Sequence, residues 1–429
     1  MVSKRAAKNT RDSAGRVLIL VENLSVPFDR RVWREATALT EKGYQVTVIC
    51  PRGKQYDRKK REVIDNISIY RCNIHEADTG LLSYIYEYTQ ALVKMMLLSI
   101  VVFFKEGFDV IQTCNPPDLL FFVALPYKLL GKKIIFDHHD LSPETYLAKV
   151  GSQKPGITHK VLSVLERITF ATADVVMSTN ESYKQIATSR GGQDQNNVVV
   201  VRNGPDLERV RKVKENPELR RGKKHLIFYI GTMGAQDGVD FLLRSVEHLV
   251  RNSGRRDFHV LVMGGGTELD KVKRYASELG IDDVTEFTGR VPDERVIEAL
   301  STADVCVCPD PKTQLNDIST MNKTLEYMAV AKPLVAYDLK ETRVSAGDAA
   351  LYAAANDEKD FADKIAELLD SEDLRHKLGE IGRQRIEQDL SWEHSKKKLY
   401  EAYALALGKA KNNRQEDCHL EISVGSSNE

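Results

Sequence analysis

Short apolar segments alternate with segments of helical periodicity along nearly the whole chain, and this alternation constrains the fold more than any other feature. Near the start, residues 17–21 are typical of a buried strand, 30–42 of a helix that Gly43 ends, and 46–50 of a second strand. A strand–helix–strand unit of this kind implies parallel strands joined by a right-handed crossover. The repeated pattern predicts an α/β architecture.

The alternation is interrupted once, at Asn203, Gly204 and Pro205, and a charge-rich stretch follows before the second series of strands begins near residue 226. A chain of 429 residues is also too long for one ordinary core. We therefore expect two doubly wound Rossmann-like domains facing across a cleft, with ligands at the carboxyl ends of the strands. The predicted parts are a disordered basic arm (1–15), an N-terminal domain (16–205), a C-terminal domain (206–390), a helix packing back towards the N-terminal domain (391–410) and a disordered tail (411–429).

The charge balance and the apolar runs of the chain argue against several classes of function. The 62 basic and 62 acidic residues balance, which argues against a nucleic-acid binder. No apolar core follows the basic residues of the arm, so we expect no secretory signal. The apolar run at 91–104 is shorter than the roughly 20 residues of a membrane span; a core helix is the favoured interpretation and an interfacial helix the alternative. The six scattered cysteines match no metal-binding spacing and suggest a reducing cytoplasm.

The segment 317–332 is the richest in chemistry. A polar loop with Ser319 and Thr320 as candidate N-caps opens a helix, whose N-terminus favours phosphate. Lys323 adds a positive charge in the first turn, and Glu326 lies three residues on, where a carboxylate could accept two sugar hydroxyls. The spacing suits a diphosphate and a ribose together, but it equally suits an ordinary surface ion pair.

Two glycine-rich loops follow strands of the predicted C-terminal domain. Gly231 and Gly234 lie in the first, and Gly264, Gly265 and Gly266 in the second. Glycine lets a backbone approach a ligand closely, but no dinucleotide-binding fingerprint is formed. Each loop alone is more typical of a tight strand-to-helix turn; two in one domain favour ligand binding modestly.

Two clusters mark the N-terminal domain. Asp137, His138, His139 and Asp140 end a predicted strand, where they could act in proton transfer. A metal site is less favoured, because adjacent residues on an extended chain point apart. The second cluster, at 29–34, places Asp29, Arg30, Arg31 and Arg34 at the start of a helix. It could contact an anionic acceptor or the opposite domain, or simply hold a helix face through Asp–Arg pairs.

Together these segments resemble glycosyltransferase family four, the retaining enzymes of GT-B fold, and in particular a bacterial subgroup of surface-polysaccharide assembly. In the N-terminal half the matching motifs are Asp-Arg-Arg-Val at 29–32, Asn-Pro-Pro-Asp at 115–118, Asp-His-His-Asp at 137–140 and Val-Arg-Asn-Gly at 201–204. In the C-terminal half they are Gln-Asp-Gly-Val-Asp at 236–240, Phe-Thr-Gly-Arg at 287–290 and Glu-Tyr-Met-Ala at 326–329.

The resemblance implies roles for particular residues. Glu326 matches the second of two donor-site glutamates and would hold the ribose; the first falls on Ile318, so Asp317 would have to substitute. Thr232 and Asp237 stand where many relatives place an arginine and a lysine, which leaves Lys323 for the diphosphate. The base would rest near Gly289, Arg290 and Val291, with Ser319, Thr320, Gly231 and Gly234 around the phosphates. His139 would line the reaction centre, with His138 as second choice and Asp140 beside them.

The expected activity is retaining transfer of a sugar from a nucleotide-diphosphate sugar to a saccharide or lipid-linked acceptor, in polysaccharide or glycolipid biosynthesis. A UDP-sugar is favoured over a GDP-sugar, and neither metal nor cofactor is required in principle. We expect a cytoplasmic protein with at most weak contact to the inner face of the plasma membrane. A degenerate nucleotide-sugar-binding partner protein and a sugar-nucleotide epimerase are the alternatives.

Overall fold

The computed structural model describes residues 14–53, 56–75, 81–150 and 154–409. Most of the predicted basic arm, with Lys4, Arg5, Lys8 and Arg11, and almost all of the predicted tail lie outside these residues. The chain divides into two compact units. Of the described residues, the first unit contains those up to Pro143, those from Pro155 to Val201 and those from Lys396 on; the second contains those of Glu144–Lys154 and Arg202–Ser395.

The first unit is built on an eight-stranded sheet of order β3-β4-β2-β1-β5-β6-β7-β8, parallel except for the β3–β4 hairpin. Asp65 and Asn66 turn this hairpin with positive φ angles of 48° and 64°, which short polar side chains tolerate. The strands are β1 (Gly15–Leu20), β2 (Tyr44–Pro51), β3 (Arg61–Ile64), β4 (Ile67–Cys72), β5 (Val110–Cys114), β6 (Lys133–His138), β7 (Val175–Ser178) and β8 (Val198–Val200).

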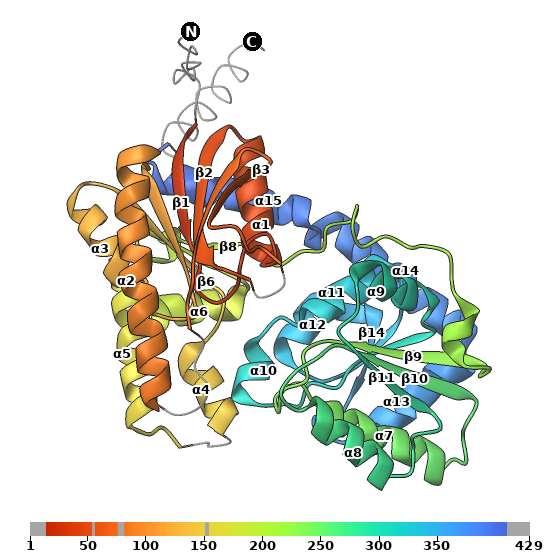
Figure 1. Ribbon diagram of the computed structural model, residues 1–429. Helices are drawn as coiled ribbons and strands as arrows, with labels where there is room; N and C mark the ends of the chain where they lie inside the picture. Colours follow the sequence, from red (N-terminus) through yellow and green to blue (C-terminus); the bar gives the residue numbers. More distant parts are fainter. Residues whose placement is uncertain (1–13, 54–55, 76–80, 151–153, 410–429) are drawn as a thin grey trace, which may run out of the picture. The chain divides into compact units, whose positions relative to one another are not determined.

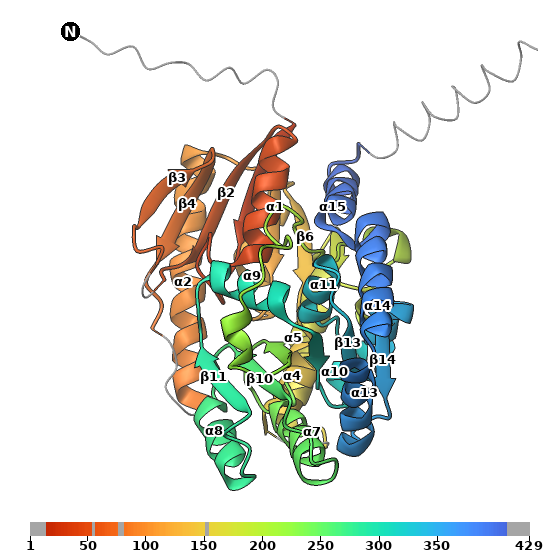
Figure 2. The same ribbon diagram turned by 90° about the vertical axis from the view of Figure 1, so that its right-hand side faces the viewer.

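Helices cover both faces of this sheet (Figures 1 and 2). α2, α3 and α5 pack in succession on one face, and α1 lies on the other beside β2. The last helix returns to this unit, where the Tyr403 hydroxyl donates to the side chain of Gln112 on β5. The helices of this unit are α1 (Arg30–Glu41), α2 (Leu81–Lys105), α3 (Phe121–Leu129), α5 (Ile157–Thr172), α6 (Glu181–Ser189) and, from Lys396 on, α15 (Trp392–Ala406). Helix α4 (Ser142–Val150) belongs to the second unit from Glu144 on.

Helix α2 corrects the interpretation of the apolar run at 91–104 as a helix buried in the core. Its inner stripe, with Met95 and Val102, is buried against the sheet and α3. Its outer stripe is also apolar but exposed, and Phe104 there retains 80% of its surface. Among the described residues, this helix alone is long and apolar enough, over Ile85–Lys105, to cross a membrane by length and composition.

The second unit holds a six-stranded parallel sheet of order β11-β10-β9-β12-β13-β14. Its strands are β9 (His225–Ile230), β10 (Phe258–Met263), β11 (Thr285–Gly289), β12 (Val305–Cys308), β13 (Leu334–Tyr337) and β14 (Ala350–Ala353). Its helices are α7 (Val239–Arg251), α8 (Leu269–Glu278), α9 (Asp293–Thr302), α10 (Gln314–Ile318), α11 (Asn322–Ala329), α12 (Lys340–Ala346), α13 (Glu358–Asp370) and α14 (Glu372–Arg385).

Buried side chains fill both faces of this second sheet, one cluster under α7, α8 and α13 and another under α9 and α11. Strand β9 lies between β10 and β12, so the chain order reverses beside it. In a doubly wound sheet, the loops at such a switch point form the ligand site. The fold therefore indicates that the ligand site lies in the loops that follow β9, β10 and β12.

Candidate active site

The loops after β9 and β10 lie against each other at the carboxyl edge of the second sheet. Gly264 has a φ of 135°, and a Cβ there would lie 1.8 Å from the carbonyl oxygen of Gly231. A Cβ on Gly266 would lie 2.4 Å from the carbonyl oxygen of Met233. Only glycine fits such close approaches. These glycines therefore shape a bare backbone cradle, which explains the two glycine-rich loops of the sequence.

Lys323, in the first turn of α11, reaches this cradle. Its Nζ lies 2.6 Å from Oδ1 of Asp310 and 5.0 Å from the ring centroid of Tyr229, and its Cε would lie 3.4 Å from a Cβ on Gly231. Burial lowers the pKa of Lys323, but the Asp310 carboxylate outweighs burial and the net pKa is raised. The ammonium is therefore charged and held at the edge of the glycine loops.

The N-terminus of α11 differs from the sequence expectation. Ser319 does not cap this helix: it ends α10, and its hydroxyl donates to the carbonyl oxygen of Leu315 at 2.7 Å. Met321 takes the N-cap position of α11 and offers no side-chain hydrogen bond. Thr320 lies in the short connection between the two helices. The first N–H groups of α11 therefore have no side-chain cap, which leaves them suited to an anion.

Glu326 does not pair with Lys323. Its Oε1 lies 2.5 Å from a guanidinium nitrogen of Arg209, which also contacts Asp293 at 3.2 Å. The interpretation of Lys323 and Glu326 as an ordinary surface ion pair is therefore wrong for this structure. Each has its own partner, and Arg209, from the charge-rich stretch that follows Pro205, fixes the Glu326 carboxylate.

Other predicted donor-side residues have structural roles of their own. Oδ1 of Asp317 accepts the backbone N–H of Lys340 at 2.9 Å and so caps α12. Oδ2 of Asp237 accepts the N–H of Gly234 at 2.8 Å, which fixes the first glycine loop. The carbonyl oxygen of Thr232 accepts the Tyr229 hydroxyl.

The three residues predicted near the base lie at the end of β11. Gly289 has a φ of 70°, and its carbonyl oxygen accepts the N–H of Gly264 at 3.0 Å. The exposed side chain of Arg290 passes over Gly265. Val291 packs partly against the core. They border the second glycine loop, on the same edge of the sheet as Lys323.

In the first unit, His139 belongs to a buried cluster of charged groups. Its Nε2 contacts Oδ2 of Asp137, and the side chain is 16% exposed. Arg31 grips the same carboxylate through Nη2 to Oδ1 at 2.6 Å and Nε to Oδ2 at 3.2 Å. Oδ1 of Asn115 accepts the backbone N–H of His139 at 2.7 Å. The imidazole is thus held at the carboxyl end of β6.

The charges of this cluster depend on one another. Burial alone would raise the pKa of Asp137, but Arg31 and His139 hold it well below its usual range. Burial lowers the pKa of His139, and the Asp137 carboxylate more than compensates, so the net pKa is raised. Burial, with the Asp137 charge, raises the pKa of Glu35 to about 7. A carboxylate that orients and charges an imidazole is a common device of acid–base sites.

His138 and Asp140 occupy different surroundings. His138 is fully buried among the rings of Phe136, Phe170 and Tyr183. Burial lowers its pKa to about 3, so the imidazole is neutral. The geometry makes His138 a core residue, out of a substrate's reach. Asp140 is exposed, and its N–H donates to Oδ1 of Asn115 at 3.2 Å.

The residues predicted for the acceptor side differ in burial and in their partners. Asp29 caps α1 by accepting the N–H groups of Arg31 and Val32. Arg30 is exposed. Arg31 is buried and committed to Asp137, Glu35 and the carbonyl oxygen of Val201. Arg31 therefore positions Asp137 from within, so of the two alternatives for this helix start the ion-pair interpretation applies to Arg31, and its assignment to the acceptor side is corrected.

Cys114, Asp137 and His139 place one potential metal-ligand atom each within 4.8 Å of one another, the one such group among the described residues. The donor set fits a cation poorly. Burial and the neighbouring carboxylates raise the pKa of Cys114 well above its usual value in the cluster as it stands. The Asp137 carboxylate is already paired with the Arg31 guanidinium. We therefore derive no metal chemistry from this cluster.

Sequence reasoning missed several residues that the structure brings to these sites. Asp310 lies between two prolines directly after a strand, a position that could have marked it. Arg209 was hidden in a charge-rich stretch, where no local pattern distinguishes it. Gln112 donates to Glu35 at 2.7 Å and to Asp137 at 3.2 Å, and only the pairing of β5 with β6 reveals that contact.

Comparison with known families decides what these two sites belong to. The model described as Glycosyltransferase Family 4 matches residues 29–209, and the model described as Glycosyl transferases group 1 matches residues 224–371. The chain therefore carries two glycosyltransferase domains, one of each description. The two models divide the chain between 209 and 224, close to the boundary between the two units at Val201.

Individual relatives are more distant. A D-inositol 3-phosphate glycosyltransferase of Corynebacterium jeikeium is 26% identical over 185 residues, which are 42% of this chain and 43% of that protein. The chain thus matches less than half the length of this curated relative.

Solved structures show the GT-B fold over almost the whole chain. Sucrose-phosphate synthase from Thermosynechococcus elongatus has a TM-score of 0.71 at 18% identity and covers 94% of this chain and 100% of its own. The Anabaena protein HepE in complex with UDP-glucose has a TM-score of 0.67 at 12% identity, covering 91% and 99%.

Proposed function

We propose that this glycosyltransferase moves a sugar from a nucleotide-diphosphate sugar, with UDP-sugars favoured, to a saccharide or lipid-linked acceptor, with retention of configuration. The observation that carries the donor assignment is Lys323: its charged ammonium lies at a cradle of bare glycine backbone, beside an uncapped helix N-terminus. A positive point charge and helix N–H groups without a side-chain cap, at one edge of a sheet, suit a diphosphate. The UDP-glucose bound to HepE, a neighbour of the same fold, supports the choice of nucleotide.

The remaining roles are assigned from the contacts that each residue makes within its own unit. Glu326, fixed by Arg209 through Oε1, would accept the ribose hydroxyls mainly through Oε2. His139, oriented and charged by Asp137, is the candidate catalytic group of the first unit. A leaving diphosphate held by Lys323 and backbone N–H groups is stabilised electrostatically. We place the reaction in polysaccharide or glycolipid biosynthesis in the cytoplasm; the free thiols of the described cysteines fit a reducing compartment.

Three titrations separate the assigned roles. UDP, uridine and inorganic pyrophosphate are titrated by calorimetry into the full chain, into Lys323→Met and into Glu326→Ala. Lys323→Met should weaken UDP and pyrophosphate by at least about tenfold, the effect of losing one charge-assisted contact. Glu326→Ala should weaken UDP and uridine but leave pyrophosphate binding intact.

Lys271→Ala is the matched control, because Lys271 is an exposed lysine of the same unit, paired with Glu268 at 2.7 Å; it should change none of the three affinities. Unchanged UDP affinity in Lys323→Met would overturn the diphosphate site. Incubation with UDP-sugars then distinguishes the alternatives. Release of UDP, with the sugar passed to water in place of the acceptor, supports a transferase. A changed sugar nucleotide indicates an epimerase, and binding without either reaction indicates a degenerate partner protein.

A further inference from the structure

Three helices of the first unit expose apolar stripes at helical spacing. On α2 the stripe consists of Ile85, Tyr86, Val93, Leu97, Ile100, Val101 and Phe104; on α3 and its end, of Phe122, Leu125, Leu129 and Leu130; on α5, of Ile157, Val161, Val164 and Ile168. These helices pack side by side, α3 against both α2 and α5, on one face of the sheet (Figure 1). We call their combined outer surface the apolar face.

This surface is not a general property of the molecule. Among the described residues, fifteen large apolar side chains are exposed on the apolar face, against two, Val213 and Val344, in the stretch Arg202–Ser395. Leu129 and Ile157 retain 83% and 84% of their surface. A contiguous exposed patch of this kind marks a binding surface. Its inner counterparts, such as Met95 and Val102, are buried in the core, so α2 cannot leave the sheet to span a bilayer without dismantling that core.

The charges on the apolar face indicate what covers it. The charged side chains classed as exposed on α2, α3 and α5 are Lys105, Lys160 and Arg167, all basic. The acidic residues of these helices are Glu87, which is half-buried, and Glu166, which is buried against Arg190. An apolar surface fringed by basic groups complements the interface of an anionic membrane, where apolar side chains enter the headgroup boundary and lysines meet phosphates.

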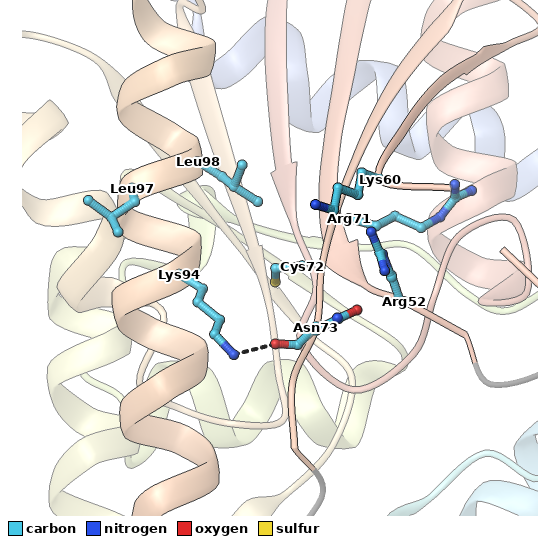
Figure 3. Close-up of a pocket in the computed structure, with 8 residues that line it drawn as sticks. All are labelled: Arg52, Lys60, Arg71, Cys72, Asn73, Lys94, Leu97 and Leu98. Carbon is cyan, nitrogen blue, oxygen red and sulfur yellow. Dashed lines mark hydrogen bonds between the residues drawn. The ribbon is translucent and has the colours of Figure 1, made fainter. Parts of the chain in front are cut away.

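A basic pocket opens at the edge of this face (Figure 3). It has a volume of about 300 Å³ and is lined by Leu97 and Leu98 of α2, and by Lys94 opposite Arg52, Lys60 and Arg71. Arg71 donates hydrogen bonds to Glu62 and to the carbonyl oxygen of Val26, and Lys94 donates one to the carbonyl oxygen of Asn73. Nε of Arg52 is buried without a hydrogen-bond partner among the described residues. The pocket therefore has donor capacity left for an anion.

We propose that the apolar face lies on an anionic lipid surface, with one headgroup phosphate entering the pocket at Arg52 and Lys60. This proposal does not depend on sugar transfer, because it concerns attachment to the bilayer and is measured without substrate. It explains why three outer helices keep apolar stripes where the second unit exposes polar ones. It also gives a protein that acts on a lipid-linked acceptor a way to remain at the surface that carries it.

Flotation of the full chain with vesicles tests the proposal. Vesicles of phosphatidylcholine with about 30% phosphatidylglycerol should carry the protein upward, and vesicles of pure phosphatidylcholine much less, since each basic group near an anionic surface contributes about 1 kcal/mol. The triple variant Val93→Glu, Leu97→Glu and Phe104→Glu should lower partitioning by at least about tenfold. Arg52→Gln with Lys60→Gln should lower it severalfold on the anionic vesicles only.

Two control variants test whether vesicle binding depends on the apolar face. Val213→Glu with Val344→Glu adds acids at exposed apolar sites of the second unit and should leave flotation unchanged. Replacing Lys4, Arg5, Lys8 and Arg11 by Ser removes the basic arm and should reduce binding less than the α2 variant does. Circular dichroism confirms folding of each variant. No flotation on anionic vesicles, binding unaffected by the α2 variant, or dimerisation in ultracentrifugation that the α2 variant abolishes without any lipid binding would each overturn the proposal.

Discussion

Both sheets carry a buried ion pair near the carboxyl ends of their strands, and the two pairs are built differently. Asp137 of the first unit receives Arg31 on both carboxylate oxygens, and the same guanidinium also reaches Glu35 and the carbonyl oxygen of Val201. Asp310 of the second unit receives Lys323 on one oxygen, while its Oδ2 is buried with no hydrogen-bond partner among the described residues. The first pair is saturated; the second is not.

The difference shows what each pair can do. A bidentate Arg–Asp contact has fixed geometry, and its Asp137 can pass that order on to His139. An ammonium with three donors and one short ion pair can still turn towards an incoming phosphate without leaving Asp310. We infer that the saturated Arg31–Asp137 pair, here called the closed pair, positions a neighbouring side chain. The unsaturated Lys323–Asp310 pair, here called the open pair, binds a ligand. Variants of each pair test this contrast.

Asp137→Asn should have the largest effect. It leaves the Arg31 guanidinium buried with a weaker set of partners, and breaking a buried pair costs about 3–5 kcal/mol. Trp33 of α1 reports this unit in a Trp392→Phe background, because the chain has two tryptophans. The urea midpoint read from Trp33 fluorescence should fall markedly. Asp109→Asn is the matched control: that carboxylate is about one-third exposed in its pair with Arg16, and its loss should cost about 1 kcal/mol or less. Equal losses would show that Asp137 is no more than an ordinary surface partner.

The fold was largely readable from the sequence, because alternating apolar segments fix parallel strands and crossover helices. The returning helix predicted over 391–410 is observed over Trp392–Ala406, so its start agrees within one residue and its end is four residues earlier. The sites were less readable because their contacts are long-range. Arg31 looked like a surface residue of a helix start, and only the pairing of β1, β5 and β6 brings Asp137 to it.

Helix α2 shows a second limit. Its apolar run has no polar face, and sequence pattern alone cannot say whether the outer side meets protein or something else. Likewise, Ser319 and Thr320 have good N-cap chemistry, but the chain forms the extra short helix α10 before them, which shifts the start of α11 to Asn322. Local propensity indicated a cap, and the tertiary context moved it.

Asp310→Asn tests the open pair and should have an intermediate effect. If Asp310 and a diphosphate share Lys323, removing the carboxylate removes a competing negative charge. The affinity for UDP should then rise by about tenfold or less, roughly 1 kcal/mol at the effective dielectric of a protein surface. The gain should disappear in the Lys323→Met background, which calorimetry of the double variant checks. A fall in affinity in the single variant would mean that Asp310 holds Lys323 in place, and the contrast with Asp137 would fail.

The pH dependence that arises from His139 should be the smallest effect, and its sign is defined. The folded-state pKa of His139 is raised above its ordinary value of about 6.5 because Asp137 outweighs burial. The stabilisation from the charged imidazole is therefore complete below the unfolded-state pKa and is lost as pH rises through the folded-state pKa. Urea midpoints of the wild type and His139→Gln, compared across pH 5 to 9, should differ most at the acidic end and converge at the basic end. His376→Gln is the matched control, since that imidazole is 75% exposed beside Glu372, and its midpoints should follow the wild type throughout. A His139→Gln difference that stayed constant with pH would mean that the closed pair orients a neutral imidazole, which could accept a hydrogen bond from a sugar hydroxyl but could not supply a positive charge to it.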